Sequence, residues 1–364
     1  MTQPNTELNR STVHDMSPIP NSRDRGRQAF IFHTKRHLGQ FARSKLQEAY
    51  EREAADALPV MRSQSIFAAW SALNIGSQQQ MWRALGDMVF REQSRMEDQA
   101  KAILSQPSVG SLALDQQLQL PQYFTQTAYH GQPGGYCLSS HDNDWFAGAL
   151  QEAGGTLYSR GAGTGTKDSK GQAVVRFIQE RHPQFTPERL VDLGCGYGGQ
   201  TSNYVVGFPR AEVHGVDLGA GLLRYAHLRA ESLGLAIHFK QACAGDTGFP
   251  DESFDLVVSN ILLHEVPREM LDAVMCESFR LLKPGGLVVH QDVPTQRPGT
   301  PAFQQWLSDW QVAHNDEPFW RSFSVTSVPD ALVSAGFSRE TVFEAYQPQV
   351  DGPLVWYLVG ARKS

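Results

Sequence analysis

The feature that most constrains how this chain can fold is a glycine-rich turn within LVDLGCGYGGQT at residues 190–201. A short apolar run ends at Leu193 and is followed by closely spaced glycines. Glycine lets a backbone approach a ligand closely, because no Cβ intervenes. The sequence therefore predicts a strand that ends at a ligand site and turns directly into a helix. The glycines concerned are Gly194, Gly196, Gly198 and Gly199.

Around this turn, short apolar runs alternate with segments of helical periodicity. Such alternation predicts a parallel sheet with helices on both faces. Two further strand-like runs, 341–346 and 354–360, are expected to close the sheet as an antiparallel pair. The predicted fold class is therefore α/β, a doubly wound Rossmann-like sheet over residues 169–364. The expected strands are 189–193, 212–216, 237–241, 254–259 and 287–291, and the expected helices are 170–179, 221–233 and 268–282.

The chain before this domain divides into three segments by composition. Residues 1–28 are polar and contain prolines, so they are expected to form a disordered arm. Residues 29–105 repeat apolar side chains at helical spacing and are predicted to be a helical module, which could serve as a homodimer interface. Residues 106–168 are rich in glycine, proline and aromatic side chains, a composition often found in lids, so this segment is predicted to cover the site.

Charge and cysteine content limit the expected partners. Lys and Arg number 32 against 38 for Asp and Glu, and the resulting net charge of −6 gives no overall field that would attract nucleic acid or an anionic membrane. No uncharged apolar run approaches the roughly 20 residues that span a bilayer, and the polar start does not resemble a signal peptide. The 4 cysteines are widely separated without a CxxC pair, so we expect reduced thiols in a cytoplasmic protein.

The glycine turn by itself is compatible with two cofactors. Gly194, Gly196 and Gly199 satisfy the GxGxxG pattern of dinucleotide sites, which leaves an NAD(P)-dependent oxidoreductase open. Asp192 stands before the first glycine, where its carboxylate would repel a pyrophosphate. S-adenosylmethionine instead brings an ammonium and a sulfonium, which a carboxylate attracts. Asp217, at the end of the next expected strand, is placed to bind ribose hydroxyls.

Residues 190–293 resemble a class I S-adenosylmethionine-dependent methyltransferase. Asp192 and the first three alternate glycines match the DxGxGxG loop of that family, and Asp217 matches its ribose-binding acid. FPDESFDLVVSNILLHEVP at 249–267 matches the segment running into and beyond the fourth strand, and LLKPGGLVVHQD at 281–292 matches the turn and fifth strand. The resemblance implies methyl transfer to a small molecule, at an oxygen or an activated carbon, in specialised metabolism. A protein acceptor docked on the helical module is the alternative.

The resemblance also implies which residues hold the methyl donor. The loop, the ribose acid, the adenine edge and the end of the fourth strand contribute. Tyr158 and Arg160, which precede the domain, are added, and Arg160 is expected to pair with the donor's carboxylate. Cys243 stands about where many family members carry an acid, so the adenine contacts depart from the family pattern. The expected donor-binding residues are Asp192, Gly194, Gly196, Gly198, Asp217, Leu218, Cys243, Ala244, Asn260, Tyr158 and Arg160.

Candidate catalytic residues follow the later strands. His264 comes after the fourth expected strand, at the edge of the sheet where open α/β folds bind ligands, and its ordinary pKa suits a general base. Glu265 beside it and His290 at the end of the fifth strand are the other catalytic candidates. His264, His290 and His314 match no local metal motif, so no metal is expected.

Aromatic and histidine side chains of the lid, and of the segment after the fifth strand, are expected to hold the acceptor. Such side chains exclude water and favour an apolar or planar molecule. These candidates are Tyr123, Tyr129, His130, His141, Trp145, Trp310 and His314.

Overall fold

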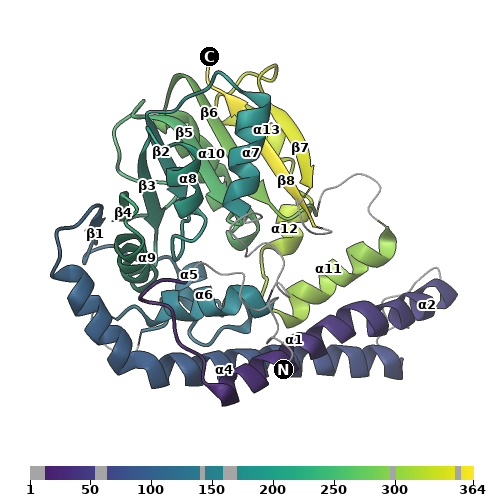
Figure 1. The fold of residues 1–364 in the computed structure, drawn as a ribbon. Helices are drawn as coiled ribbons and strands as arrows, with labels where there is room; N and C mark the ends of the chain where they lie inside the picture. Colours follow the sequence, from purple (N-terminus) through teal and green to yellow (C-terminus); the bar gives the residue numbers. More distant parts are fainter. Residues whose placement is uncertain (1–12, 54–63, 140–143, 159–169, 296–300, 349–353) are drawn as a thin grey trace.

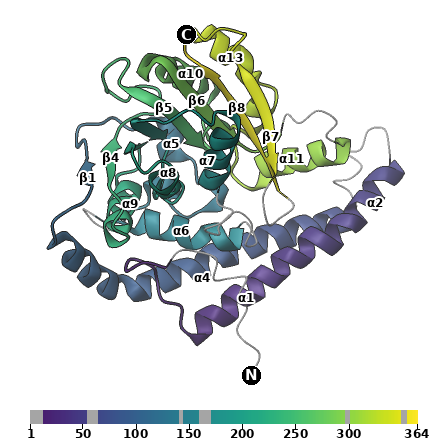
Figure 2. The same ribbon diagram turned by 45° about the horizontal axis from the view of Figure 1, so that its top comes forward.

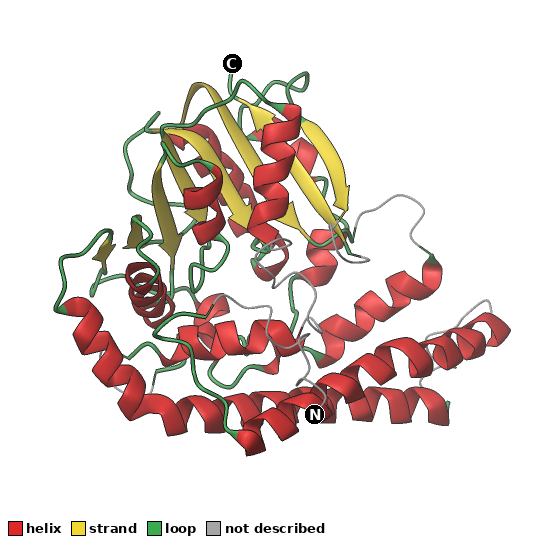
Figure 3. Ribbon diagram, viewed as in Figure 1, coloured by secondary structure: helices red, strands yellow, loops and turns green. Residues whose placement is uncertain are grey.

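The computed structural model describes residues 13–53, 64–139, 144–158, 170–295, 301–348 and 354–364. A twisted sheet flanked by helices forms one half of the molecule, and long helices from the start of the chain lie across the other half (Figure 1). Figure 3 shows the same division by secondary structure, with strands confined to the upper part of the view.

In the described part of the chain, eight strands form one sheet in the order β1-β4-β3-β2-β5-β6-β8-β7. Neighbouring strands run parallel except β8, which is antiparallel to both β6 and β7. The predicted α/β class, the strand–helix alternation and the closing antiparallel pair are thus confirmed. The strands are β1 (Ser111–Ala113), β2 (Arg189–Leu193), β3 (Glu212–Asp217), β4 (Ile237–Gln241), β5 (Phe254–Asn260), β6 (Leu282–Asp292), β7 (Phe343–Pro348) and β8 (Val355–Arg362).

Helices cover both faces of this sheet and build the separate layer below it. None of the helices in the described ranges is long and apolar enough to cross a membrane. The helices are α1 (Ser22–His37), α2 (Arg43–Glu53), α4 (Ser65–Leu104), α5 (Gln122–Gln126), α6 (Phe146–Tyr158), α7 (Lys170–Arg181), α8 (Thr201–Gly207), α9 (Ala220–Ser232), α10 (Arg268–Leu281), α11 (Ala302–His314), α12 (Trp320–Ser324) and α13 (Val328–Ser334). A π-helical turn, η2 (Leu38–Ala42), joins α1 to α2, and η3 (Tyr129–Gly131), η4 (Gly135–Cys137) and η5 (Leu263–Glu265) are short 3₁₀ turns.

The central strands are buried because helices pack on both faces. Leu190, Val191 and Leu193 of β2 are completely buried, and they divide between two apolar clusters on opposite sides of the sheet. A strand that is covered on both faces has apolar side chains at nearly every position. This continuous apolar run is why the sequence predicts β2.

The helical module differs from its prediction in its extent. The apolar stripes predicted over 29–105 lie largely on α4, a single helix of 40 residues. The arm predicted over 1–28 is corrected from residue 13 onward: α1 begins at Ser22, and Met16 is completely buried. The reason is local, since the side chains of Asn21 and Asp24 form a reciprocal capping box that starts the helix.

The predicted lid is also more regular than expected. It contributes β1 at the sheet edge and α6, a helix that packs between α4 and α9. Figure 2 shows α6 lying between the sheet and α4, with α1 alongside α4. Small side chains permit this close packing: a Cβ added at Gly148 would lie 2.3 Å from the Cβ of Tyr225 on α9. The segment therefore contributes a helix to the layer between α4 and the sheet.

Replacing Gly148 with alanine should destabilise the fold by about 1–3 kcal/mol, because α6 and α9 would have to separate. Gly86→Ala is the matched control, since Gly86 lies within α4 with nothing within 4 Å of an added Cβ. The free energy of unfolding of the control should rise by about 0.5–1 kcal/mol, because alanine has a higher helix propensity than glycine. Denaturant unfolding of both variants measures the difference, and equal stabilities would contradict close α6–α9 packing.

Candidate active site

A cavity of about 1040 Å³ lies at the carboxyl ends of the parallel strands. The glycine turn (residues 194–199) and the ends of β3 and β5 form its wall on the sheet side. The segment containing η3 and η4, together with α4 and α11, encloses it from the other side. Ligands bind at this edge in open α/β sheets, so the cavity is the candidate active site.

The glycine turn forms a narrow cradle along this wall. Gly194, Gly196 and Gly198 have φ angles of +71°, +54° and +75°, which L side chains rarely adopt. A Cβ on Gly194 would lie 2.8 Å from Leu262, and one on Gly196 would lie 2.9 Å from Oε1 of Gln151. A residue other than glycine would therefore be strained at these two positions and would collide with Leu262 or Gln151.

Asp217 fixes the cradle from below. Its Oδ2 accepts a hydrogen bond from Gly196 N at 2.9 Å, and its Oδ1 accepts one from Gly219 N at 2.8 Å. Burial nevertheless raises the pKa of Asp217 to about 6, because the two backbone donors offset only part of the desolvation.

Asp192 is completely buried at the end of β2. It accepts hydrogen bonds from Thr201 Oγ1 at 2.7 Å and from Asn260 Nδ2 at 3.5 Å, and burial raises its pKa to about 7. Neither Asp192 nor Asp217 has an ion-pair partner among the described residues. Asn260 Oδ1 is likewise buried without a hydrogen-bond donor from that part of the chain. Two buried carboxylates beside a glycine cradle fit a cationic ligand, as the donor predicted from the sequence would be.

His264 lies in η5, directly after β5. The preceding backbone is strained, since the β-branched Ile261 has a φ of +57°. Asp292 at the end of β6 holds His264 in place: its Oδ1 lies 2.5 Å from Nδ1, and its Oδ2 accepts hydrogen bonds from the backbone nitrogens of Leu263 at 2.8 Å and His264 at 3.4 Å. Burial lowers the pKa of His264, but the charge and hydrogen bond of Asp292 outweigh that effect and raise it to about 8.

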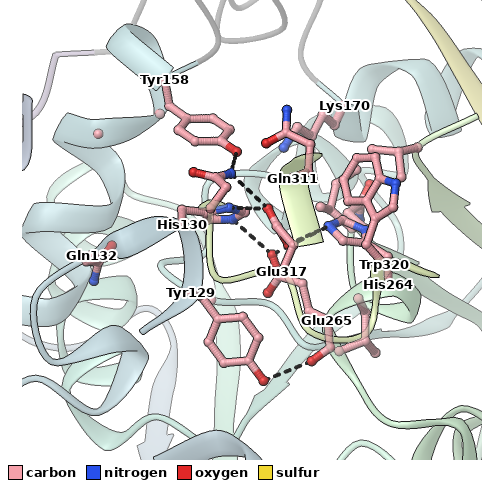
Figure 4. A pocket seen from close by; sticks show the side chains of 18 of the residues that line it. Tyr129, His130, Gln132, Tyr158, Lys170, His264, Glu265, Gln311, Glu317 and Trp320 are labelled. Carbon is pink, nitrogen blue, oxygen red and sulfur yellow. Dashed lines mark hydrogen bonds and ion pairs between the residues drawn. The ribbon is translucent and has the colours of Figure 1, made fainter. Parts of the chain in front are cut away.

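A second imidazole, His130, lies between two carboxylates. Its Nδ1 is 2.6 Å from Glu317 Oε1, and its Nε2 is 3.2 Å from Glu265 Oε1 (Figure 4). Burial opposes protonation, but these carboxylates raise the pKa of His130 well above its ordinary value. The backbone carbonyl of His130 accepts hydrogen bonds from Gln78 and Trp82 of α4, each at 2.8 Å, which hold the residue at a φ of +58°. The helical module thus positions a charged side chain in the cavity.

Most of the residues predicted from the sequence reach the cavity wall. On the donor side these are Asp192, Gly194, Gly196, Asp217, Leu218, Ala244, Asn260 and Tyr158. On the acceptor side they are His264, Glu265, Tyr123, Tyr129, His130, Trp310 and His314. Arg160 and His141 lie outside the described residues.

Four predicted residues do not line the cavity. His290 is completely buried in the sheet, where Nδ1 pairs with Ser259 Oγ at 2.8 Å and burial lowers its pKa to about 3. Trp145 packs in the apolar cluster formed by the helices of the lower layer. Cys243 lies against Met270, with 3.5 Å between the sulfur atoms, and Gly198 packs against Phe239 and Ala226 behind the turn. These placements remove His290 from the catalytic candidates and Trp145 from the candidate contacts to the acceptor.

Among the wall residues that the sequence did not predict, three make polar or charged contacts at the site. Gln151 accepts a hydrogen bond from Tyr197 N at 3.2 Å, Lys170 lies near the ring of Trp356, and Glu317 joins the histidine cluster. Glu317 lies within the tryptophan-rich segment that was expected to form the acceptor pocket, and an acidic side chain among aromatic ones was the available signal. In the described part of the chain, no group of three or more His, Cys, Asp or Glu side chains is arranged to hold a metal.

Comparisons with known proteins agree with this arrangement. A family model described as a methyltransferase domain matches residues 190–286. Trans-aconitate 2-methyltransferase of Deinococcus radiodurans is 34% identical over 202 residues, which are 52% of this chain and 75% of that protein. Fatty-acid O-methyltransferase of Mycolicibacterium smegmatis is 33% identical over 122 residues, 34% of this chain and 43% of that protein. Malonyl-[acyl-carrier protein] O-methyltransferase of Methylococcus capsulatus is 35% identical over 119 residues, 32% of this chain and 40% of that protein. The match to the last two spans less than half of their length.

Replacing Asp192 with asparagine should weaken binding of S-adenosylhomocysteine roughly tenfold or more, because a charge-assisted contact to the ligand's ammonium would be lost. Calorimetric titration measures this, with Asp251→Asn as a control that removes an exposed carboxylate paired with Arg280. Unchanged affinity in folded Asp192→Asn would contradict the donor assignment.

The same variant should alter the pH dependence of stability. The folded-state pKa of Asp192 is raised to about 7, so the folded protein binds a proton that the unfolded chain releases near pH 4. Stability therefore falls as pH rises from about 4 to 7, and Asp192→Asn should show a shallower fall. Denaturant unfolding across this pH range is the measurement. If stability falls equally steeply with pH in both proteins, the raised pKa of the buried Asp192 carboxyl is contradicted.

Proposed function

Because the chain belongs to the class I S-adenosylmethionine-dependent methyltransferases, we propose that it methylates an oxygen or an activated carbon of a small molecule enclosed in this cavity. One observation carries the proposal: His264, oriented by Asp292, faces the same cavity as the glycine turn. The names of two relatives support a small acceptor, since one acts on fatty acids and another on trans-aconitate.

S-adenosylmethionine supplies an electrophilic methyl carbon when it is bound. The residues that would hold it are the glycine turn, Asp217 toward the ribose, and Asp192 with Asn260 toward the cationic end. The buried, uncompensated carboxylates and the open cradle described above fit such a group. The protein's own contribution is then to orient the acceptor and to exclude water, since alignment alone supplies much of the acceleration in methyl transfer.

Several side chains are suited to that task. Tyr129 and Tyr136 stack with 4.9 Å between ring centroids and form a rigid wall, and Tyr129 donates a hydrogen bond to the backbone carbonyl of Glu265 at 2.9 Å. Trp320 packs edge-on against His264 at 4.9 Å. These aromatic groups keep the imidazole in a dry environment, where its interaction with an acceptor is stronger than in water.

The first test is titration with S-adenosylhomocysteine, NAD and NADP. Binding of the sulfur nucleoside alone is expected, because a pyrophosphate would face Asp192. A donor carrying a labelled methyl group then separates the acceptor classes. Label in small molecules supports the proposal, whereas label retained on protein would identify a macromolecular acceptor and overturn it.

Replacing His264 with asparagine should lower turnover about 100-fold or more, because the group that exchanges hydrogen bonds with the acceptor is lost. Affinity for S-adenosylhomocysteine should stay within about threefold, since His264 is not among the residues that would hold the donor. His182→Asn, before β2 and away from the cavity, is the matched control. Full activity of His264→Asn would assign the histidine to packing.

A further inference from the structure

Glu317 carries a buried oxygen atom that the fold leaves without a hydrogen-bond donor. The residue connects α11 to α12, and its side chain is 1% exposed. Oε1 lies 2.6 Å from His130 Nδ1 and accepts a long hydrogen bond from Asn315 Nδ2 at 3.4 Å. No donor among the described residues bonds Oε2, although Glu317 lines the cavity.

A ring nitrogen of His264 lies close to this oxygen. Nε2 of His264 lies 3.8 Å from Oε2, which is beyond hydrogen-bond distance but close enough for one ligand atom to reach both (Figure 4). Glu265 differs, because its Oε1 already accepts from Tyr136 at 3.1 Å and pairs with His130. A buried carboxylate oxygen without a donor is costly, so the pair formed by Glu317 Oε2 and His264 Nε2 is arranged for a ligand.

The two atoms require opposite hydrogen-bonding roles of that ligand: one donates a hydrogen bond to it, and the other accepts one from it. Nδ1 of His264 is paired with Asp292, so a protonated His264 donates through Nε2, while Oε2 of Glu317 can only accept. A carboxylate offers no hydrogen and is repelled by Glu317. Most aliphatic amines are ammonium ions at neutral pH, and an ammonium has no lone pair and is repelled by a protonated His264. A hydroxyl oxygen accepts one hydrogen bond and donates another, and it satisfies both atoms.

We propose that the methyl acceptor is an alcohol or phenol whose hydroxyl bridges His264 and Glu317, and that Glu317 receives its proton. This rests on the proposed function and narrows it to a hydroxyl acceptor, which differs from the acids in the names of the relatives reported above. His130 is then a positioning residue: it holds Oε1 so that Oε2 faces His264.

The step balances without a further reactant. The hydroxyl O–H bond breaks, and its proton moves to Glu317 Oε2. The oxygen's electron pair forms the new bond to the methyl carbon, and the pair of the broken carbon–sulfur bond stays on sulfur. The products are a methyl ether and S-adenosylhomocysteine, and Glu317 returns its proton to water before the next turnover.

The chemical class of the product tests the assignment directly. The full-length protein is incubated with isotope-labelled methyl donor and a pool of phenols, alcohols, amines and carboxylic acids on shared carbon skeletons. Nuclear magnetic resonance of the labelled carbon then separates ethers, esters, N-methyl and C-methyl products. Ethers are expected. Label on nitrogen, on carbon or in an ester would overturn the hydroxyl assignment and leave the proposed function standing, whereas no transfer to any small molecule would overturn both.

The pH profile of turnover tests which group takes the proton. His264 is faced by Asp292 from β6, by Glu265 in its own turn, by Glu317 before α12, and by the rings of Trp320 and Phe323. With Glu317 as proton acceptor, His264 works in its protonated form, so turnover falls as pH rises through about 8. If turnover instead rises with pH through the same range, His264 is the base, and the assignment of the proton acceptor to Glu317 is overturned.

Glu317→Gln should lower turnover at least 100-fold while S-adenosylhomocysteine affinity stays unchanged. Glu317→Asp should recover part of the loss, because a carboxylate remains one methylene further back. Glu340→Gln, an exposed carboxylate outside the cavity, controls for loss of charge and should match the parent. Full activity of Glu317→Gln would overturn the proposal, and the pH profile of the unaltered protein decides independently if the variant does not fold.

Discussion

The carboxylate of Asp292 is the interaction on which the site depends. It stands at the end of β6 and receives hydrogen bonds from Leu263, from the backbone and ring of His264, and from Val293. One buried acid thereby fixes the course of the chain after β5 and sets both the orientation and the charge of the imidazole. Because β5 and β6 are neighbouring parallel strands, their carboxyl ends meet at the edge where the cavity opens.

Charge is distributed unevenly within the cavity. The end proposed to bind the methyl donor and the end proposed to bind the acceptor therefore favour different ligands. At the donor end, Asp192 and Asp217 are buried carboxylates without cationic partners from the described part of the chain, which favours a positively charged ligand. At the acceptor end, His130 and His264 are interleaved with carboxylates, so the cluster is close to neutral and selects by hydrogen-bond direction. A low-dielectric cavity strengthens both effects.

The helical module contributes to this acceptor end although it lies far from the site in sequence. Gln78 and Trp82 of α4 hold the carbonyl of His130, and Gln78 also donates to Asn315 beside Glu317 at 3.3 Å. A helix of 40 residues can act in this way because it is rigid, and its side chains hold the loops that pack on it in fixed positions. The module is therefore part of the cavity in which we propose that the acceptor binds.

The sequence by itself determined the sheet and the donor end of the cavity. Buried parallel strands read as apolar runs, and glycines that need positive φ angles cannot be replaced without strain, so β2, Gly194 and Asp217 could be identified locally. The tertiary structure alone decided which polar groups meet across the cavity. His264 follows an apolar strand and His290 lies near the end of another. Only His264 reaches the cavity wall, because the strained backbone at Ile261 turns the chain away from the sheet while His290 remains inside it. Glu317 comes from a segment distant in sequence from both His130 and His264, and sequence periodicity describes a residue's own element and not the partners that folding brings to it.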